Sequence, residues 1–294
     1  MKSGNYINPV YKLSLRDATQ VPRRISYSQW SMYEKCPKQW KLSYIDGLAP
    51  FNYGINLSFG TAFHETLQDY LTVLYTDSVK QADKLDLSTM LINNLRKEYT
   101  ESVEKNNGEH FSNPDELTEY LEDGIEVELC SQASEDNPNV FWYGFIDLVV
   151  RHIPSNTITI YDIKTSRMGW NKWQKADNIK SAQLIAYKNY FSKQFGIPKE
   201  NIDVEFFIVK RKLIENSMFP QKRIQIHRPA AGTVTQKKVQ KSIDTFISNC
   251  FDKDGNKNTS AKYLAIAGKG SKHCKWCPFK TDDINCPKKE RIRE

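Results

Sequence analysis

Long hydrophobic runs are missing from this 294-residue sequence, which contains only six Cys, 13 Gly and 12 Pro. No apolar stretch approaches the about 20 residues that a bilayer span needs, and the N-terminal segment MKSGNYINPVYKLSL lacks the apolar core of a secretory signal. We therefore expect a cytoplasmic protein without a membrane partner. The small share of Gly and Pro, with 39% hydrophobic residues, excludes collagen, low-complexity filaments and disorder.

Charge is distributed unevenly along the chain. Residues 65–139 hold 5 Lys and Arg against 18 Asp and Glu, a net charge of −13, whereas residues 164–241 hold 17 against 5, a net charge of +12. The basic segment also contains many aromatic residues, a mixture that neutralises phosphates and stacks on bases. It favours a nucleic-acid partner, although charge runs are more often solvated faces. The expected phosphate contacts are Arg167, Lys172, Lys175, Lys180, Lys210, Arg211 and Lys212.

Two kinds of recognition motif are absent. Residues 268–272 have the wrong spacing for the G-x-x-x-x-G-K-[ST] loop that cradles nucleotide phosphates, so no ATP-driven motor is expected. Neither a zinc finger nor a helix-turn-helix pattern occurs. Contacts with a nucleic acid are therefore expected mainly at phosphates and stacked bases.

The pattern of apolar residues predicts helices in the N-terminal half and strands mainly in the C-terminal half. Two short helices are expected within 26–45, with Ser26 or Ser28 as N-cap and Pro37 in the first turn of the second. A helix over 60–76 and an acidic helical region to about residue 134 follow. The remaining expected elements are an antiparallel hairpin of 139–153 with 157–165, a helix over 180–196, strands over 204–213 and 222–228, and a helix over 231–251.

These elements define an α/β or α+β fold in which helices flank a small mixed β-sheet. The helical stretch before the hairpin forms an insertion, and the last residues form a cysteine-ligated staple. We divide the chain into an extended N-terminal arm (1–25), a helical region (26–139), a core (140–252) and a cysteine-rich C-terminal segment (253–294).

Two acids and a lysine lie on the predicted hairpin. Alternation along 158–164 puts Asp162 and Lys164 on one face, while Ile163 faces the other way. The hairpin can bring Asp147 beside Asp162, and two nearby carboxylates repel unless a cation lies between them. Mg²⁺ or Mn²⁺ is the ion expected for oxygen ligands, here the two acids and the main-chain carbonyl of Ile163. For the Asp-x-Lys tripeptide alone, a surface ion pair is the commoner interpretation.

Such a set has the parts that phosphodiester cleavage needs. The ion would polarise a phosphoryl oxygen and lower the pKa of a bound water, and Lys164 would orient that water. His64, on the helix over 60–76, can supply an imidazole to the ion, although a lone helical His is more often packed or exposed. Gln183 and Tyr187 share a helix face, where they can hold a phosphate or the acids; alternatively, Tyr187 is a core residue bonded to Gln183.

The segments GTAFHETL, GFIDLV, YDIKT and AQLIAY occur in this order and resemble the successive motifs of the RecB-like branch of the PD-(D/E)XK nuclease superfamily. The resemblance covers about residues 26–190 and implies a restriction-endonuclease-like fold and a metal-dependent deoxyribonuclease. It implies catalytic and metal-binding roles for His64, Asp147, Asp162 and Lys164, with Gln183 and Tyr187 in support. Gln68 departs from the pattern, because many relatives carry Glu there.

Three functions fit this resemblance. The first is a DNA exonuclease that acts on ends or single strands in recombination, repair or DNA processing, alone or with a helicase or recombination partner. The second is a site-specific or structure-specific endonuclease of the same fold. The third is an inactive DNA-binding or assembly module, which the intact set of acids, histidine and lysine argues against.

The C-terminal segment contains a C-x2-C-x8-C pattern, formed by Cys274, Cys277 and Cys286. Three clustered thiols need a fourth ligand. Cys130 and Cys250 are expected in the middle of helices as core residues, and His273 adjoins the cluster, so Cys36 is the best fourth ligand. One early and three late cysteines resemble the iron-sulfur staple of AddB and CRISPR-associated nucleases, which implies a 4Fe-4S cluster. Zn²⁺ and reduced thiols without metal are the alternatives.

Overall fold

The computed structural model describes residues 18–48, 55–87, 89–94, 96–97, 127–152, 155–214, 217–218 and 220–293. Its N-terminal elements are η1 (Ala18–Gln20), β1 (Arg23–Ile25), α2 (Tyr27–Lys35), α3 (Pro37–Trp40), the π-helical turn η2 (Lys41–Ile45), α4 (Ile55–Thr76) and α5 (Val79–Ala82). The middle of the chain forms β2 (Val127–Gln132), β3 (Val140–Ile146), β4 (Leu148–His152), β5 (Thr157–Ser166), α7 (Lys172–Lys175) and α8 (Asn178–Phe195). The remaining elements are η4 (Lys199–Asn201), β6 (Ile202–Lys210), β7 (Ile224–His227), α9 (Thr233–Cys250), η5 (Lys269–Ser271) and η6 (Lys288–Glu290).

The strands form two mixed sheets. In the first, β3 is the central strand, parallel to β1 and antiparallel to β2. In the second, the order is β4-β5-β6-β7, with β5 and β6 parallel and the two outer pairs antiparallel. The parallel pair is connected through α8, which packs on both strands. This βαβ unit confirms a mixed α/β fold.

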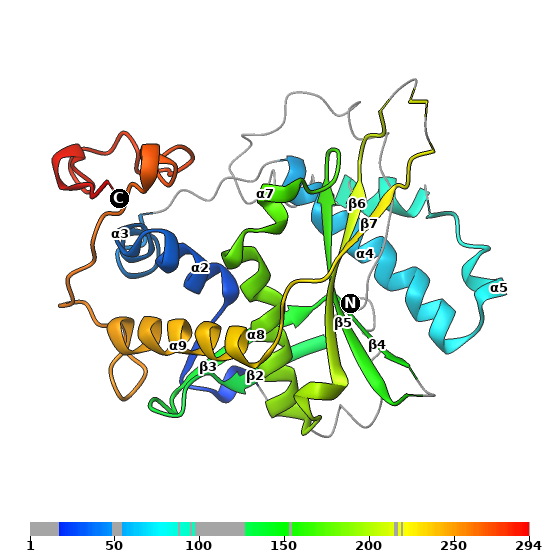
Figure 1. Ribbon diagram of the computed structural model, residues 1–294, viewed down its shortest axis with the longest axis horizontal. Helices are drawn as coiled ribbons and strands as arrows, with labels where there is room; N and C mark the ends of the chain where they lie inside the picture. Colours follow the sequence, from blue (N-terminus) through cyan, green and yellow to red (C-terminus); the bar gives the residue numbers. More distant parts are fainter. Residues whose placement is uncertain are drawn as a thin grey trace.

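Helices cover both sides of the second sheet (Figure 1). On one side, α2, α8 and α9 belong to the main hydrophobic core, which contains Ile158 and Ile160 of β5. On the other side, Phe59 and Phe63 of α4 pack against Ile163 of the same strand. Alternate side chains of β5 therefore pack into two different cores, which fixes the direction of each side chain.

The N-terminal helices begin where the sequence predicts. Ser26 is the N-cap of α2, and its hydroxyl accepts a hydrogen bond from the N–H of Gln29. Of the two predicted N-cap residues, Ser26 is therefore the correct one. Pro37 occupies the first turn of α3, where its missing N–H costs no hydrogen bond. At the other end of the core, α8 ends at Gly196, whose φ of 67° is the left-handed conformation that glycine adopts readily.

The predicted acidic helix is wrong at its C-terminal end. Residues 127–132 form β2, and Cys130 is therefore a strand residue, although it is buried as expected. Gln194 of α8 explains the pairing, because its side chain accepts the N–H of Cys130 and donates to the carbonyl of Glu128. Pairing with β3 and contact with α8 thus override local helix preference. Residues 98–126 of the predicted acidic region lie outside the described residues.

The predicted hairpin differs too, because its first strand is broken at Asp147. The segment before the break, β3, belongs to the first sheet, and only β4 pairs with β5. The strands therefore form two sheets in place of the single small sheet expected. The predicted arm also differs at its end, where Arg23–Ile25 pairs with β3 as β1, while residues 1–17 lie outside the described residues.

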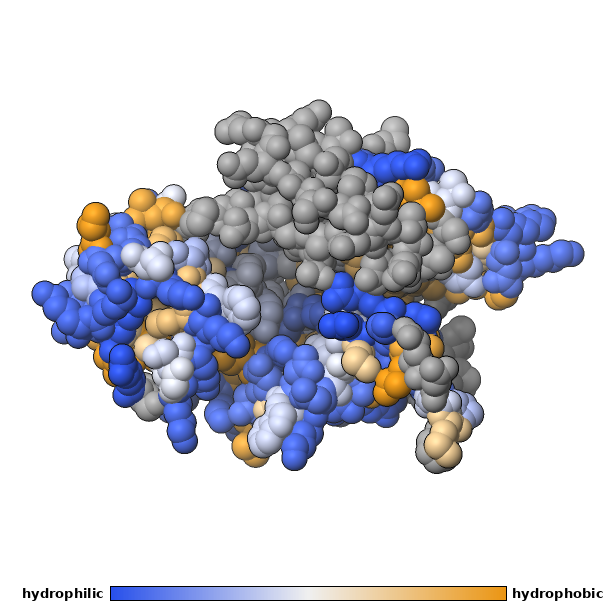
Figure 2. All heavy atoms as spheres, turned by 90° about the horizontal axis from the view of Figure 1, so that it is seen from above, coloured by the Kyte–Doolittle hydropathy of each residue, from blue (hydrophilic) through white to orange (hydrophobic). Residues whose placement is uncertain are grey.

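The surface seen from above is mostly hydrophilic, and its hydrophobic areas are small and separate (Figure 2). Among the most exposed apolar side chains, Met218 precedes β7, whereas Trp276 and Ile284 belong to the C-terminal segment. None of the helices in the described ranges is long and apolar enough to cross a membrane.

Trp40 joins the N-terminal helices to the rest of the core, and we expect its replacement to destabilise the whole fold. Its ring is fully buried and contacts the rings of Phe246, Phe251 and Tyr263. Trp40→Ala should lower the free energy of unfolding by about 3–5 kcal/mol, measured by urea denaturation. Trp173→Ala is the matched control because Trp173 is 74% exposed. Equal losses for the two variants would contradict this assignment.

Candidate active site

Asp147 lies at the point where the chain leaves the first sheet and enters the second. Its carboxylate Oδ2 accepts a 2.6 Å hydrogen bond from the main-chain N–H of Ile163 on β5. Asp147 lies between β3 and β4, where the main chain makes no strand pairing with β5. Its side chain makes the contact to β5 instead. The bond holds the carboxylate of Asp147 against the strand that also carries Asp162.

Asp162 and Lys164 lie together on β5, as the alternation predicts. The ammonium Nζ of Lys164 is 2.9 Å from Oδ1 and 2.7 Å from Oδ2 of Asp162. Asp162 is only 1% exposed, whereas the Lys164 side chain is 36% exposed. The pair is therefore buried at the acid and open to solvent at the amine, unlike the surface ion pair that the tripeptide alone suggested.

His64 projects from α4 toward Asp147. Its Nδ1 lies 3.4 Å from Oδ1 of Asp147, and its side chain is 24% exposed. The preceding residue, Phe63, is buried against Ile163, so the helix is anchored to β5 at this point. The histidine and the two acids are thus positioned by three separate segments of the chain.

The charged groups alter one another's pKa values. Burial raises the pKa of Asp162 to about 6, with Asp147 adding to the rise and Lys164 opposing it. Burial also acts upward on Asp147, but His64, Lys164 and the N–H of Ile163 together hold the pKa of Asp147 below its usual value. Burial acts downward on His64 and Lys164, yet the two carboxylates raise the pKa of both. The site therefore holds two acids that only nearby positive charge keeps ionised.

Tyr187 and Gln183 lie beside these acids on α8. The side-chain amide of Gln183 donates a 3.1 Å hydrogen bond to the hydroxyl of Tyr187. Burial, Asp162 and Asp147 all raise the pKa of Tyr187 far above its ordinary value. Tyr187 is thus a buried residue bonded to Gln183, as the core interpretation expects, and it lies near both acids. A role of the pair in holding a phosphate or the acids stays a prediction.

Tyr27 is a neighbour of the site that sequence reasoning missed. Its hydroxyl donates to the carbonyl of Ile179 at 3.1 Å, which ties α2 to the first turn of α8. Burial and then Asp162 raise its pKa well above the usual range. Tyr27 is far from the acids in the sequence, and no local pattern in SYSQW connects it to them.

Metal ligation is not preformed in this arrangement. Within the described ranges, no three His, Cys, Asp or Glu side chains adopt positions suited to hold a metal ion. The donor chemistry nevertheless fits a hard divalent cation, because two carboxylates converge and Oδ2 of Asp162 is buried without a hydrogen bond. Lys164 is the cation that this oxygen contacts in the structure.

Three of the seven predicted phosphate contacts lie just beyond the ends of β5 and β6, and Lys210 is the last residue of β6. The main chain continues the pairing there, with bonds of 2.8 Å from the N–H of Arg211 to Ser166 and from that of Lys212 to Arg167. The others are on α7 and in the first turn of α8. In the sequence, all seven lie at or after the C-terminal end of β5 or β6, and Lys164 is near that end of β5. The seven are Arg167, Lys172, Lys175, Lys180, Lys210, Arg211 and Lys212.

The four cysteines of the predicted staple line one hollow, which encloses about 10 Å³. Cys36 lies between α2 and α3, and its sulfur accepts the N–H of Ile266 at 3.3 Å. The main-chain N–H of Lys38 also bonds to the carbonyl of Leu264, so the C-terminal segment docks around the early cysteine. Burial raises the pKa of Cys277, and the three other thiols raise it further.

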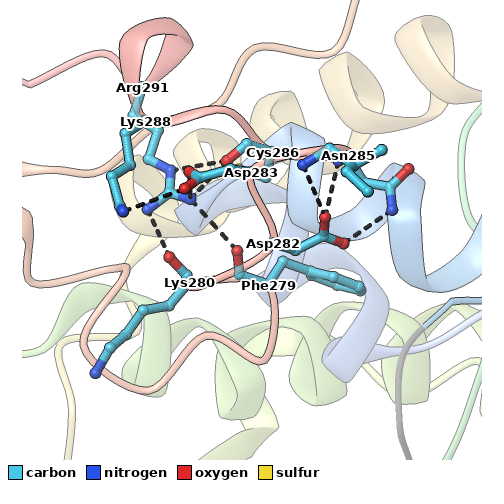
Figure 3. A network of polar contacts seen from close by, with 9 residues as sticks. Phe279, Lys280, Asp282, Asp283, Asn285, Cys286, Lys288 and Arg291 are labelled. Atoms are coloured by element: carbon cyan, nitrogen blue, oxygen red, sulfur yellow. Dashed lines mark hydrogen bonds and ion pairs between the residues drawn. The ribbon is translucent and has the colours of Figure 1, made fainter.

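Polar contacts shape the chain between Cys277 and Cys286 (Figure 3). The guanidinium of Arg291 donates to the carbonyls of Lys280 at 2.9 Å and Cys286 at 3.2 Å. His273 lines the same hollow, and its Nδ1 is buried without a hydrogen bond. The loop is thus held by the protein itself, with five sulfur or imidazole groups around one small volume.

A family model describes most of the chain. The PD-(D/E)XK nuclease superfamily model matches residues 24–281, so the chain belongs to the PD-(D/E)XK nuclease superfamily. The match includes Asp147, Asp162 and Lys164, together with the first three of the four clustered cysteines. No curated protein matches the sequence.

We expect Lys164→Met to destabilise the protein, because it leaves Asp162 buried without its cation. The loss should be about 3 kcal/mol or less, since Lys164 is 36% exposed and partly screened by solvent. Asp162→Asn in the same chain should recover part of this loss. Urea unfolding of the wild type, both single variants and the double variant in EDTA measures the coupling; strictly additive losses would contradict the ion pair.

Proposed function

We propose that this protein is a Mg²⁺- or Mn²⁺-dependent deoxyribonuclease. The observation that carries the proposal is the convergence of the buried Asp162 and the partly buried Asp147, with Lys164 at their solvent-exposed side. Membership of the PD-(D/E)XK nuclease superfamily supports a hydrolase acting on phosphodiester bonds. DNA as the substrate follows from the resemblance of the four motifs and from the basic segment.

In this proposal, Asp147, Asp162 and the main-chain carbonyl of Ile163 hold the divalent ion, with His64 as a further ligand. When bound, the ion polarises a phosphoryl oxygen and activates water for attack on phosphorus. Lys164 orients the attacking water and offsets the negative charge of the transition state. Gln183 and Tyr187 position the acids from α8, where the hydroxyl of Tyr187 is fixed by its bond to Gln183.

The basic residues beyond β5 and β6 are proposed to guide the DNA backbone to this site. Lys172 and Lys180 lie over the rings of Trp173 and Trp170, at 4.9 Å and 5.1 Å from the ring centres. Trp173 is 74% exposed, so it can stack on an unpaired base. An exposed aromatic beside cations favours an exonuclease that acts on ends or single strands, in recombination, repair or DNA processing, alone or with a helicase partner.

A structural metal centre at the four cysteines is part of the proposal. Four thiols suit both a 4Fe-4S cluster and Zn²⁺. The resemblance to the iron-sulfur branch favours the cluster, whereas a hollow of about 10 Å³, roughly room for one water, is closer in size to a single ion. For either group, the cysteines have to move to reach ligand positions. In either case the metal links the start and the end of the chain and stabilises the fold.

We expect Asp162→Ala and Lys164→Ala each to lower the cleavage rate by about 100-fold or more while DNA binding persists. The assay uses end-labelled single-stranded and double-stranded DNA with Mg²⁺ or Mn²⁺, and filter binding in EDTA measures affinity. Lys262→Ala, at an exposed position outside the site, is the control. Mononucleotide release identifies an exonuclease, and defined bands from circular duplex identify an endonuclease. Full activity of either variant, or of the wild type in EDTA, would contradict the proposal.

Anaerobically purified protein should contain iron or zinc, and Cys277→Ala should lose the metal and unfold at a lower temperature. A brown sample that absorbs near ~400 nm identifies an iron-sulfur cluster, because Zn²⁺ is colourless. Cys130→Ala keeps its metal if only the four clustered thiols bind it. The proposal of a metal centre would be wrong if the wild-type protein contained no metal and Cys277→Ala were as stable as the wild type.

A further inference from the structure

A second hollow, which we call the α8–α9 hollow, lies away from the acids and the cysteines. It has a volume of about 550 Å³ and is lined by residues of α8, η4 and the start of α9. That size falls within the about 300–1,000 Å³ of small-molecule sites. Its charged side chains are Lys188, Lys199, Lys237 and Glu200. It shares no residue with the candidate active site.

Lys188 is the unusual residue of this hollow. It is only 8% exposed, and none of the described residues forms a hydrogen bond or ion pair with its ammonium group. Burial lowers the pKa of Lys188, and Lys199 lowers it further, whereas Asp203 and Glu200 act in the opposite direction. Lys188 thus has a buried stem and an ammonium group that reaches the hollow without a direct hydrogen-bond partner, so the hollow beside it is suited to an anion.

The N-terminus of α9 opens into the same hollow. This helix has 18 residues and begins beside α8 (Figure 1), and its N-cap, Gly232, provides no side-chain hydrogen bond. The first N–H to find a main-chain acceptor is that of Gln236, which bonds to Gly232 at 3.0 Å. The N–H groups before it and the positive end of the helix dipole therefore add to the charge of Lys188.

The charges specify the class of ligand. The three lysines and Glu200 that line the hollow give a net charge of +2, which Asp203, acting on Lys188, reduces to +1. A phosphate monoester carries about −1.5 to −2 at neutral pH. The side chains of Asn189, Thr233 and Gln240 add polar groups around the remaining volume. We propose that the α8–α9 hollow binds a phosphate monoester attached to a body of nucleotide size, either a free nucleoside monophosphate or the phosphorylated end of a strand.

This site does not depend on the proposed nuclease activity. Its residues lie on the part of α8 that follows Tyr187 and on α9, whereas the acids lie on β5 and at the β3–β4 break. The monoester would contact Lys188 through its phosphate oxygens and the first turn of α9 through main-chain N–H groups. Binding should therefore persist in Asp162→Asn and in EDTA, where cleavage is expected to stop.

Calorimetric titration of the full chain in EDTA tests the proposal. The probes are deoxyadenosine 5′-monophosphate, deoxyadenosine, and one short oligonucleotide with a 5′-phosphate or a 5′-hydroxyl. Deoxyadenosine 5′-monophosphate should bind at least about tenfold more tightly than deoxyadenosine. The 5′-phosphate should also add to the affinity of the oligonucleotide, whose 5′-hydroxyl form binds in EDTA only through the proposed DNA interface. Binding by the free nucleotide or only by the phosphorylated strand identifies the source of the monoester.

Lys188→Met should weaken that binding by about tenfold or more, because it removes the charge and keeps the apolar stem. Its melting temperature without ligand should change little, since the ammonium group has no direct hydrogen bond or ion pair to lose. Lys238→Met, at an exposed position on α9 outside the hollow, is the matched control and should bind as the wild type does. Failure of both phosphorylated probes to bind, equal binding of the unphosphorylated probes, or unchanged affinity in Lys188→Met would overturn the proposal.

Discussion

The hydrogen bond from the N–H of Ile163 to the carboxylate of Asp147 is the contact on which the rest of the site depends. At 2.6 Å it joins the break between two sheets to the strand that carries Asp162 and Lys164. Without it, β3 and β4 would be one continuous strand or two unrelated ones, and the two acids would have no fixed relation. Because Ile163 also packs against α4, the same residue sets the position of His64. Ile163 thus connects the acids, the histidine and the smaller core that α4 shares with β5.

Electrostatics explains why such a site needs a cation. Asp162 is buried to the extent that its pKa rises to about 6, and Asp147 adds to that rise. Lys164 and His64 supply positive charge that keeps the pKa of Asp147 low, but they do not return the pKa of Asp162 to its usual value. The same logic applies at the α8–α9 hollow with the opposite sign, where a lysine and a helix N-terminus lack an anion. At the α8–α9 hollow this charge lies next to an accessible volume.

Much of this could be predicted from local sequence. Alternation placed Asp162 and Lys164 on one face, the residues around Pro37 and Gly196 marked helix boundaries, and four ordered motifs indicated the superfamily. Errors arose where distant contacts override local preference. The sequence of β2 predicts a helix, but the segment is a strand whose Cys130 N–H bonds to Gln194 of α8. The strand break at Asp147 is accompanied by a side-chain bond to β5 that no local pattern shows. Tyr27 and Lys188 were missed because their importance comes from burial beside charges on other segments. Predictions of metal ligands, substrate and domain boundaries remain predictions.

The most direct test of the central claim is an anomalous difference map from crystals of the protein soaked with Mn²⁺. The account predicts a manganese peak between the carboxylates of Asp147 and Asp162, within ligand distance of the carbonyl of Ile163. It also predicts that the peak disappears in Asp162→Asn crystals treated in the same way. A fully occupied manganese site elsewhere, with these two carboxylates unliganded, would contradict it.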